Sequence, residues 1–159
     1  MQTVTLKVKK LPNCRDLPRY ATAGAAGLDL TAAIDDPYTL DPGRRYAMPT
    51  GIVIEVPCGF EGQVRPRSGL AAKAGISLTN CVGTIDSDYR GEVKVLLINH
   101  GEVAYTFEPG ERIAQLLVTP VPNVEVLEVE ELTPSSQRGE GGFGSTGRGV
   151  LAAPGGTCN

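Results

Sequence analysis

The chain contains no tryptophan, one histidine and few other aromatic residues. Its four cysteines are scattered along the sequence, and no two have the C-x-x-C spacing of a zinc-binding pair. A zinc site is therefore not expected, because closely spaced ligand pairs are missing. Widely separated cysteines of this kind are typical of reduced thiols, so we expect a cytoplasmic protein.

Long hydrophobic runs and an excess of basic residues are missing as well. No segment approaches the roughly 20 apolar residues of a membrane span. The N-terminal sequence MQTVTLKVKKL alternates polar and apolar residues, which predicts a strand and not a signal peptide. The formal net charge is −3, whereas proteins that bind nucleic acid polymers usually present a basic face. Composition thus favours a small ligand over a polymer or a membrane.

What the chain does contain is glycine and proline, at 20 and 12 residues, which interrupt it too often for long helices. Between them, apolar residues recur with a period of two, as in strands. Turn sequences such as DPG, PCG and EPG separate these segments. The pattern predicts an all-β fold, a jelly-roll-like sandwich or barrel. The clearest predicted strands are GIVIEV (51–56), VKVLLINH (93–100), IAQLLVTPV (113–121) and VEVLEVEEL (124–132).

One short helix is expected over SGLAAKAG, residues 68–75, with Ser68 as its N-cap. Apolar periodicity ends near residue 132. We therefore expect a β domain over 1–132 and a flexible C-terminal arm over 133–159.

The arm contains RGEGGFGSTG, residues 138–147, in which five of ten residues are glycine. Glycines let a backbone approach a ligand and present N–H groups to phosphate oxygens. Arg138 offers a permanently charged fork for phosphate, and Phe143 a flat face for a base. The segment is typical of a flap that closes over a nucleotide. A disordered glycine-rich tail has a similar composition, so the segment alone leaves both interpretations open.

Two further clusters have polar residues of the kind that bind anions or metals. In AGLDL, Asp29 stands between two leucines, and it could equally be the outward residue of a strand. In RPRSGLA, residues 65–71, two arginines precede the expected start of the helix. Guanidinium groups, a hydroxyl and free backbone N–H groups make a plausible phosphate site, although a helix beside surface arginines gives the same pattern.

Two more clusters follow. NCVGTIDSDYRGE, residues 80–92, is predicted to form a β-hairpin that carries Asp86 and Asp88, which would share a face if the segment were regular. An acidic residue there could also be a simple turn residue. In PGERIAQ, residues 109–115, Gln115 is polar within an apolar strand, as an edge-facing glutamine would also be.

Together, AGLDL, PRSGLA, NCVGTIDSDYRGE, GERIAQLL and RGEGGFGSTG, in this order, resemble the ordered motifs of the trimeric dUTPase family. The resemblance covers residues 26–147. It implies an enzyme that hydrolyses dUTP to dUMP and pyrophosphate with Mg²⁺, which keeps uracil out of DNA and supplies dUMP for thymidylate synthesis.

The resemblance also implies the roles of individual residues. Asp86 would hold and deprotonate the water that attacks the α-phosphorus, and Ser68 would stabilise charge at the α/β bridging oxygen. Asp29 would reach the metal through water, with Mg²⁺ bound mainly by the substrate phosphates. The other implied phosphate and arm contacts are Arg67, Gly69, Gln115, Arg138, Phe143 (which covers the uracil), Gly144, Ser145 and Thr146.

The resemblance implies that selectivity lies in the predicted hairpin, whose residues 80–89 we call the selectivity segment. The side-chain amide of Asn80 and the backbone of Gly83, Thr84, Ile85 and Asp86 would pair with uracil and reject cytosine. Tyr89 would pack under the deoxyribose and leave no room for a 2′-hydroxyl. A buried polar group left unpaired discriminates strongly between such ligands.

The resemblance further implies a homotrimer whose sites are shared between subunits. Two alternatives use the same scaffold. One is a dCTP deaminase, including its bifunctional forms, which would need a glutamate acting at the base. The other is a non-catalytic nucleotide sensor, for which loss of Asp86 or of the arm would be the simplest signature. A structural β-sandwich without a ligand is a third.

Overall fold

The computed structural model describes residues 3–134 and 139–140. The chain divides into two compact units, Met1–Asn123 and Val124–Asn159. The first unit contains the regular elements, which are, in chain order, β1 (Lys7–Lys10), β2 (Arg19–Tyr20), β3 (Leu28–Thr31), β4 (Tyr38–Leu40), β5 (Arg45–Glu55), β6 (Phe60–Pro66), α1 (Ser68–Ala74), β7 (Ile76–Leu78), β8 (Gly83–Ile85), β9 (Glu92–Asn99), β10 (Tyr105–Phe107) and β11 (Arg112–Pro120).

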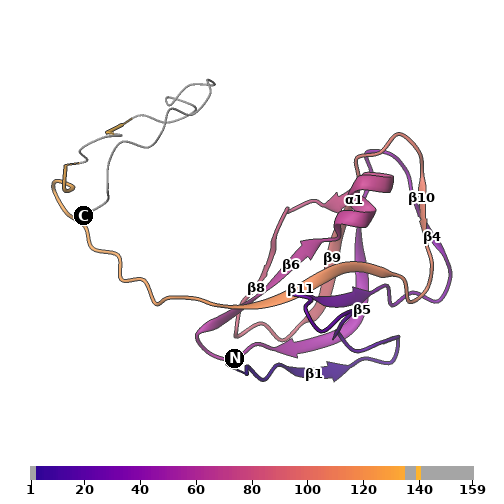
Figure 1. The fold of residues 1–159 in the computed structure, drawn as a ribbon, viewed down its shortest axis with the longest axis horizontal. Helices are drawn as coiled ribbons and strands as arrows, with labels where there is room; N and C mark the ends of the chain where they lie inside the picture. Colours follow the sequence, from indigo (N-terminus) through magenta and orange to yellow (C-terminus); the bar gives the residue numbers. More distant parts are fainter. Residues whose placement is uncertain (1–2, 135–138, 141–159) are drawn as a thin grey trace. The chain divides into compact units, whose positions relative to one another are not determined.

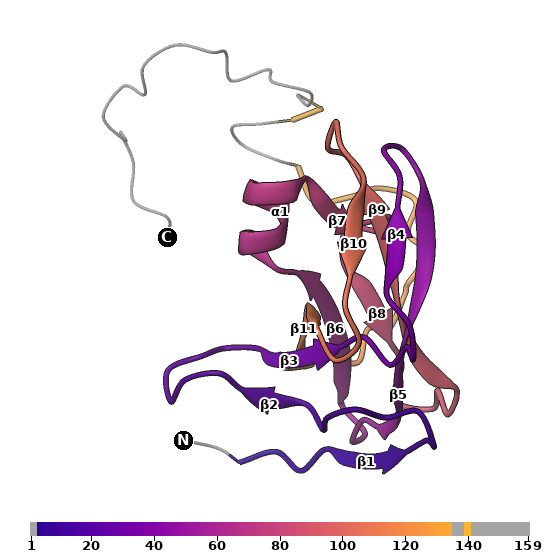
Figure 2. The same ribbon diagram turned by 90° about the vertical axis from the view of Figure 1, so that its right-hand side faces the viewer.

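Within the described residues the strands form three antiparallel sheets (Figure 1). One sheet has the order β1-β5-β9-β7, and the second has the order β2-β3-β11-β6-β8. Strands β4 and β10 pair alone and lie side by side as a two-stranded ribbon, which Figure 2 shows in front of the molecule. The predicted all-β, jelly-roll-like sandwich is confirmed, with sheets that do not close into a barrel.

A single apolar core joins the two larger sheets. In β6, β7 and β9, alternate residues point inward, as expected for antiparallel sheets with one covered face. In β9, Val93, Val95 and Leu97 are buried while Lys94 and Leu96 are exposed. Leu30, Val64 and Leu116 of the second sheet belong to the same cluster. Burial of each such side chain contributes about 1.5–3 kcal/mol to the free energy of unfolding, so the core stabilises the sandwich that holds the loops.

The short helix α1 begins one residue earlier than a Ser68 cap would require. Its N-cap is Arg67, in an extended conformation (φ −92°, ψ 125°), and Ser68 is already helical, so the predicted Ser68 cap is wrong. The chain stays extended through Arg67 because the Arg67 guanidinium is bound to β3 and β11. At the other end, Gly75 adopts the left-handed conformation (φ 69°) and its N–H donates to Ala71.

The predicted hairpin at residues 80–92 is also wrong. Strand β8 pairs with β6, whereas β9 pairs with β5 and β7, so the residues between β8 and β9 connect two sheets. Ile85 lies opposite Gly62 and is buried. A Cβ atom at Gly62 would lie 3.2 Å from the Ile85 Cβ. Gly62 of β6 thus leaves space for the side chain of Ile85 of β8, which favours the pairing of β8 with β6. Because the chain turns at Ser87 and Asp88, the regular strand that would align Asp86 with Asp88 is absent there.

The predicted strand at 124–132 does not form among the described residues of the second unit. Its apolar side chains are exposed, with Val126 at 90%, Leu127 at 78% and Leu132 at 85%. The alternating pattern suits a strand, but a strand needs a neighbour to satisfy its backbone N–H and C=O groups. None of the strands within residues 3–134 pairs with this segment.

Candidate active site

A cavity of about 450 Å³ lies beside the chain segment that connects β7 to β9. We call it the loop cavity. Strands β6, β7, β8 and β9 and the two connections between β7 and β9 supply its lining. It brings together every predicted residue of the selectivity segment and the predicted water-activating aspartate. The lining residues are Val64, Leu78, Asn80, Gly83, Thr84, Ile85, Asp86, Tyr89, Glu92, Val93, Lys94 and Leu96.

A tight turn places Asn80 beside β8. The N–H of Cys81 donates to Leu78 O at 3.2 Å, and the N–H of Val82 donates to Asn80 O at 2.7 Å. Cys81 takes a positive φ of 60°, which is uncommon for a residue with a side chain. A Cβ atom at Gly83 would lie 3.2 Å from the Asn80 Nδ2. The glycine therefore lets the Asn80 amide lie close to the strand backbone, where both can face a flat ligand.

The turn after β8 positions Asp86 and Tyr89. The N–H of Tyr89 donates to Asp86 O at 3.1 Å, and the Tyr89 hydroxyl donates to Glu92 O at 3.0 Å. Arg90 donates to the carbonyls of Ser87 and Tyr89 at 2.7 and 2.8 Å. Backbone and side-chain bonds thus fix the turn, while Asp86 stays exposed at the cavity.

A second cavity of about 210 Å³ lies at the start of β11. We call it the arginine cavity. It brings together the predicted metal-associated aspartate and four predicted phosphate contacts, together with Arg112. Its lining residues are Ala21, Ala25, Gly27, Asp29, Arg67, Ser68, Gly69, Arg112 and Gln115.

Asp29 lies between two arginines in this cavity. Its Oδ1 is 3.3 Å from Arg67 Nε, and its Oδ2 accepts a hydrogen bond from Arg112 Nη1 at 3.0 Å. The Asp29 side chain is only 13% exposed. Two cations and one anion leave one net positive charge, which suits a phosphate ligand despite the acidic chain. Next to them, Gln115 Nε2 donates to Pro66 O at 3.0 Å.

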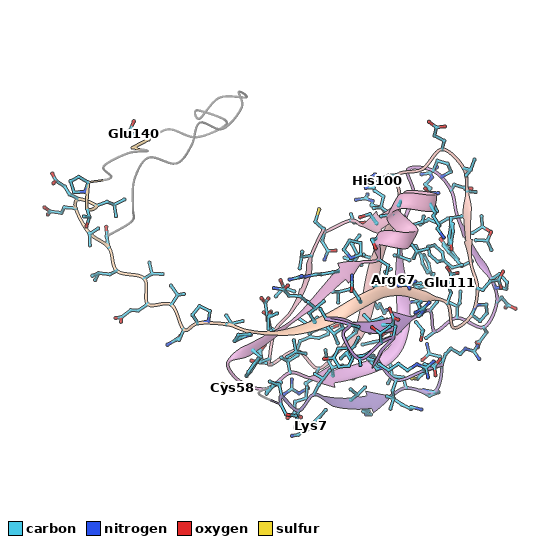
Figure 3. The ribbon with its side chains drawn as sticks, viewed as in Figure 1. Lys7, Cys58, Arg67, His100, Glu111 and Glu140 are labelled. Carbon is cyan, nitrogen blue, oxygen red and sulfur yellow. The ribbon has the colours of Figure 1, made fainter. Side chains whose placement is uncertain are left out.

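Glu111 and Tyr105 form a second network near Arg67 (Figure 3). The Tyr105 hydroxyl donates to Glu111 Oε1 at 2.5 Å, and the N–H of Glu108 donates to Glu111 Oε2 at 3.0 Å. Burial, and then the hydrogen bond and charge of Glu111, raise the pKa of Tyr105 to about 12, while the charge of Arg67 acts in the opposite direction. Both oxygens of Glu111 are therefore used to hold the turn that precedes β11.

Sequence reasoning missed Arg112, although GERIAQLL contains it. In a regular strand, residues 112 and 115 would point to opposite faces. The register of β11 against β3 shifts between Arg112 and Ala114, so this stretch is irregular. Such a bulge re-aims side chains, and here Arg112 and Gln115 line the same cavity. The regular alternation of side chains along a strand therefore could not have revealed the position of Arg112.

The loop cavity and the arginine cavity have no lining residue in common. Each one gathers a different part of the predicted site. Arg138, Phe143, Gly144, Ser145 and Thr146 lie outside the described residues. Of the predicted arm motif, the structure describes Gly139 and Glu140.

Among the described residues, no three His, Cys, Asp or Glu side chains gather as a metal-ion site. Cys14, Cys58 and Cys81 are free thiols. In the part of the chain that the structure describes, no helix has the length and apolar character needed to cross a membrane.

Comparison with known proteins assigns the family. Residues 14–147 match the family model of dUTPase. The deoxyuridine 5′-triphosphate nucleotidohydrolase of Anaeromyxobacter sp. is 57% identical over 148 residues, which cover 91% of this chain and 99% of that protein. The enzyme of the same name from Wolbachia pipientis is 55% identical, with 91% and 97% covered.

Solved structures give the same result. A mutant dUTPase of Staphylococcus bacteriophage 80alpha with bound dUpNHpp superposes with a TM-score of 0.81 at 29% identity, covering 91% of this chain and 99% of that one. A mutant dUTPase of phage phi11 of S. aureus, described with a structural Mg(II) ion, gives a TM-score of 0.72 at 25% identity, with 80% and 97% covered. The resemblance predicted from the ordered motifs is thereby confirmed, and the chain belongs to the dUTPase family.

Proposed function

We propose that this chain hydrolyses dUTP to dUMP and pyrophosphate, by attack on the α-phosphorus of a water molecule held by Asp86. The observation that carries the proposal is the composition of the loop cavity. It places an exposed carboxylate beside Asn80, Gly83 and Tyr89, in a chain of the dUTPase family. A carboxylate is ionised at neutral pH and accepts a proton from a water that it orients.

The loop cavity supports selectivity for a deoxyuridine ligand. The amide of Asn80 and the backbone of residues 83–86 offer donors and acceptors to the edge of uracil. The hydrogen bond from the Tyr89 hydroxyl to Glu92 O fixes the orientation of the ring. The ring would therefore pack against the deoxyribose in a fixed position. A bound cytosine would leave some of these groups buried without a hydrogen-bond partner. The site would therefore discriminate against cytosine by orders of magnitude.

The arginine cavity supports binding of the triphosphate. Arg67 supplies a planar fork for phosphate oxygens, and Ser68 and Gly69 begin α1, where backbone N–H groups are free of helical partners. Gln115 supplies a neutral donor on the same wall. Ser68 is exposed, so its hydroxyl is accessible to an oxygen on which charge develops.

The residues of the arginine cavity fit a magnesium ion that is carried by the substrate. Asp29 is the acidic residue of its lining, and both of its oxygens already contact arginines. That arrangement suits contact with a metal through water better than direct ligation. When bound to the triphosphate, Mg²⁺ would offset phosphate charge and aid departure of pyrophosphate.

We place the complete site between subunits of a homotrimer. The two cavities share no lining residue, which supports this proposal, because the residues that bind the triphosphate and those that bind the base can then belong to different subunits. The exposed apolar residues of 124–132 support it too, since a second copy would cover them. Arg138, Phe143, Gly144, Ser145 and Thr146 of the arm would then close over the bound nucleotide and exclude water.

A cytoplasmic location, where free thiols persist, accords with the described cysteines. There the enzyme would keep uracil out of DNA and supply dUMP for thymidylate synthesis.

The test is pyrophosphate release from dUTP, dCTP, dTTP and UTP with Mg²⁺, for the wild type and for Asp86→Asn. We expect turnover of dUTP alone, and its loss in Asp86→Asn with dUpNHpp binding retained. Turnover of dCTP with release of ammonia would assign the deaminase chemistry instead. Tight binding of dUTP without turnover of any nucleotide would make the protein a sensor.

A further inference from the structure

Asp29, Arg67 and Arg112 form a closed ring of three contacts. The Arg112 side chain donates to Asp29 Oδ2 at 3.0 Å, and Asp29 Oδ1 lies 3.3 Å from Arg67 Nε. Arg67 Nη1 donates to the backbone carbonyl of Arg112 at 2.9 Å and so closes the ring. Arg112 therefore contacts both of its partners, one through its side chain and the other through its main chain.

The ring divides the carboxylate between two arginines. With one arginine, Asp29 would draw the whole guanidinium of Arg67 into a two-bond pair, the geometry that arginine and carboxylate favour. Here the second oxygen is taken by Arg112, whose contact is the shorter of the two. Arg67 keeps a single, longer contact to Asp29. The Arg67 guanidinium is therefore more available to bind an incoming phosphate.

The turn before β11 holds Arg112 in this place. The N–H of Ala32 donates to Glu111 O at 2.8 Å, and both side-chain oxygens of Glu111 are engaged by Tyr105 and the N–H of Glu108. The irregular register after Arg112 aims its side chain at the cavity.

From these contacts we propose that Arg112 is a positioning residue of the hydrolysis reaction. It orients the Asp29 carboxylate and limits the hold of Asp29 on Arg67, so that both are correctly placed for the magnesium-bound triphosphate. The inference rests on the proposed function. It assigns Arg112 an action through Asp29, not a direct contact with phosphate.

The substitution Arg112→Gln isolates the side chain, because the carbonyl that accepts from Arg67 is present in any residue. Binding of dUpNHpp is measured by calorimetry for the wild type, Arg112→Gln, Asp29→Asn and the double variant, each in Mg²⁺ and in EDTA. Partners that orient a metal-associated carboxylate are worth about 10-fold or more in affinity. We expect Arg112→Gln to weaken binding in Mg²⁺ by about 10-fold. In the Asp29→Asn background it should change binding by less than about twofold, because the residue it positions is gone.

Equal losses from Arg112→Gln in both backgrounds would overturn the proposal, since Arg112 would then act on the ligand independently of Asp29. No loss in either background would overturn it as well. Wild-type binding that is identical in Mg²⁺ and EDTA would instead contradict the metal part of the proposed function, and the comparison of backgrounds would still decide the role of Arg112.

The Arg15–Asp35 pair is a matched control, because it joins an arginine and an aspartate at 2.5 Å and lines neither cavity. Arg15→Gln should leave dUpNHpp binding unchanged. Thermal unfolding of each variant shows whether it folds, and Arg112→Lys replaces Arg112→Gln in the same comparison if the glutamine variant does not. Lysine keeps the charge but not the planar fork, so the same dependence on Asp29 is expected of it.

Discussion

The Tyr89 ring lies directly against the backbone of Gly91. A Cβ atom at Gly91 would lie 2.3 Å from the Tyr89 hydroxyl oxygen and 2.6 Å from the ring carbon that bears it. The same hydroxyl donates to Glu92 O at 3.0 Å. The absence of a side chain at Gly91 thus allows Tyr89 to occupy this position. Tyr89 is the residue proposed to face the deoxyribose.

Gly91→Ala should therefore weaken discrimination between dUTP and UTP. The methyl group would push the phenol out of place, and displacement of a positioned group by about 1 Å costs on the order of 100-fold in rate. We expect kcat/KM for dUTP to fall and its ratio to that for UTP to narrow, as measured by pyrophosphate release. Gly24→Ala is the control, because a Cβ atom at Gly24 would meet nothing within 4 Å. An unchanged ratio in Gly91→Ala would show that Tyr89 does not set sugar selectivity.

A second glycine should act on the triphosphate. A Cβ atom at Gly27 would lie 2.7 Å from Gln115 Oε1 and 3.0 Å from Gln115 Cβ. We expect Gly27→Ala to displace the Gln115 amide from Pro66 O and to weaken binding of dUpNHpp on the order of 10-fold. Deoxyuridine, which has no phosphate, should bind as it does to the wild type. Equal loss for both ligands in calorimetry would place the effect of Gly27 outside the phosphate site.

Much of the fold and site was predictable because it depends on local pattern. Period-two alternation predicted β9, β11 and the second half of β5, since one face of each covers the core. The ordered motifs supplied the predicted site residues that the structure places in the linings of two cavities, but they did not single out Arg112.

What was not predictable depends on partners that are distant in sequence. The pairing of β8 with β6 depends on the space beside Gly62, which no local pattern of residues 80–92 contains. The role of Arg112 depends on a bulge that breaks the parity of β11. The alternation of 124–132 suits a strand, but none of the described sheets offers this segment a neighbouring strand with which to pair.

Tyr105 makes stability depend on pH at the alkaline end. Its pKa is raised from 10.0 to about 12 in the folded protein by burial and by Glu111. Between these values the folded state holds a proton that the unfolded state releases, so the free energy of unfolding should fall as the pH rises from about 10 to 12. Tyr105→Phe should remove this contribution. Denaturant unfolding of both proteins at pH 8, 10 and 11.5 measures it, and parallel curves would contradict the assignment to Tyr105.

Mixing two inactive variants should restore activity if sites are shared between subunits. Asp86→Asn removes the carboxylate of the loop cavity, and Arg67→Gln removes a guanidinium of the arginine cavity. In mixed trimers, some sites would combine an intact Asp86 from one subunit with an intact Arg67 from another. Random assembly at equal amounts would give intact sites at about a quarter of positions. We therefore expect about a quarter of wild-type dUTP hydrolysis after the two variants are unfolded and refolded together. Mixing Asp86→Asn with Asp86→Ala should restore none, because both variants lack the same group. If the first mixture also stayed inactive while refolded wild type regained its activity, both cavities would have to serve one ligand within a single chain, and the shared site would be excluded.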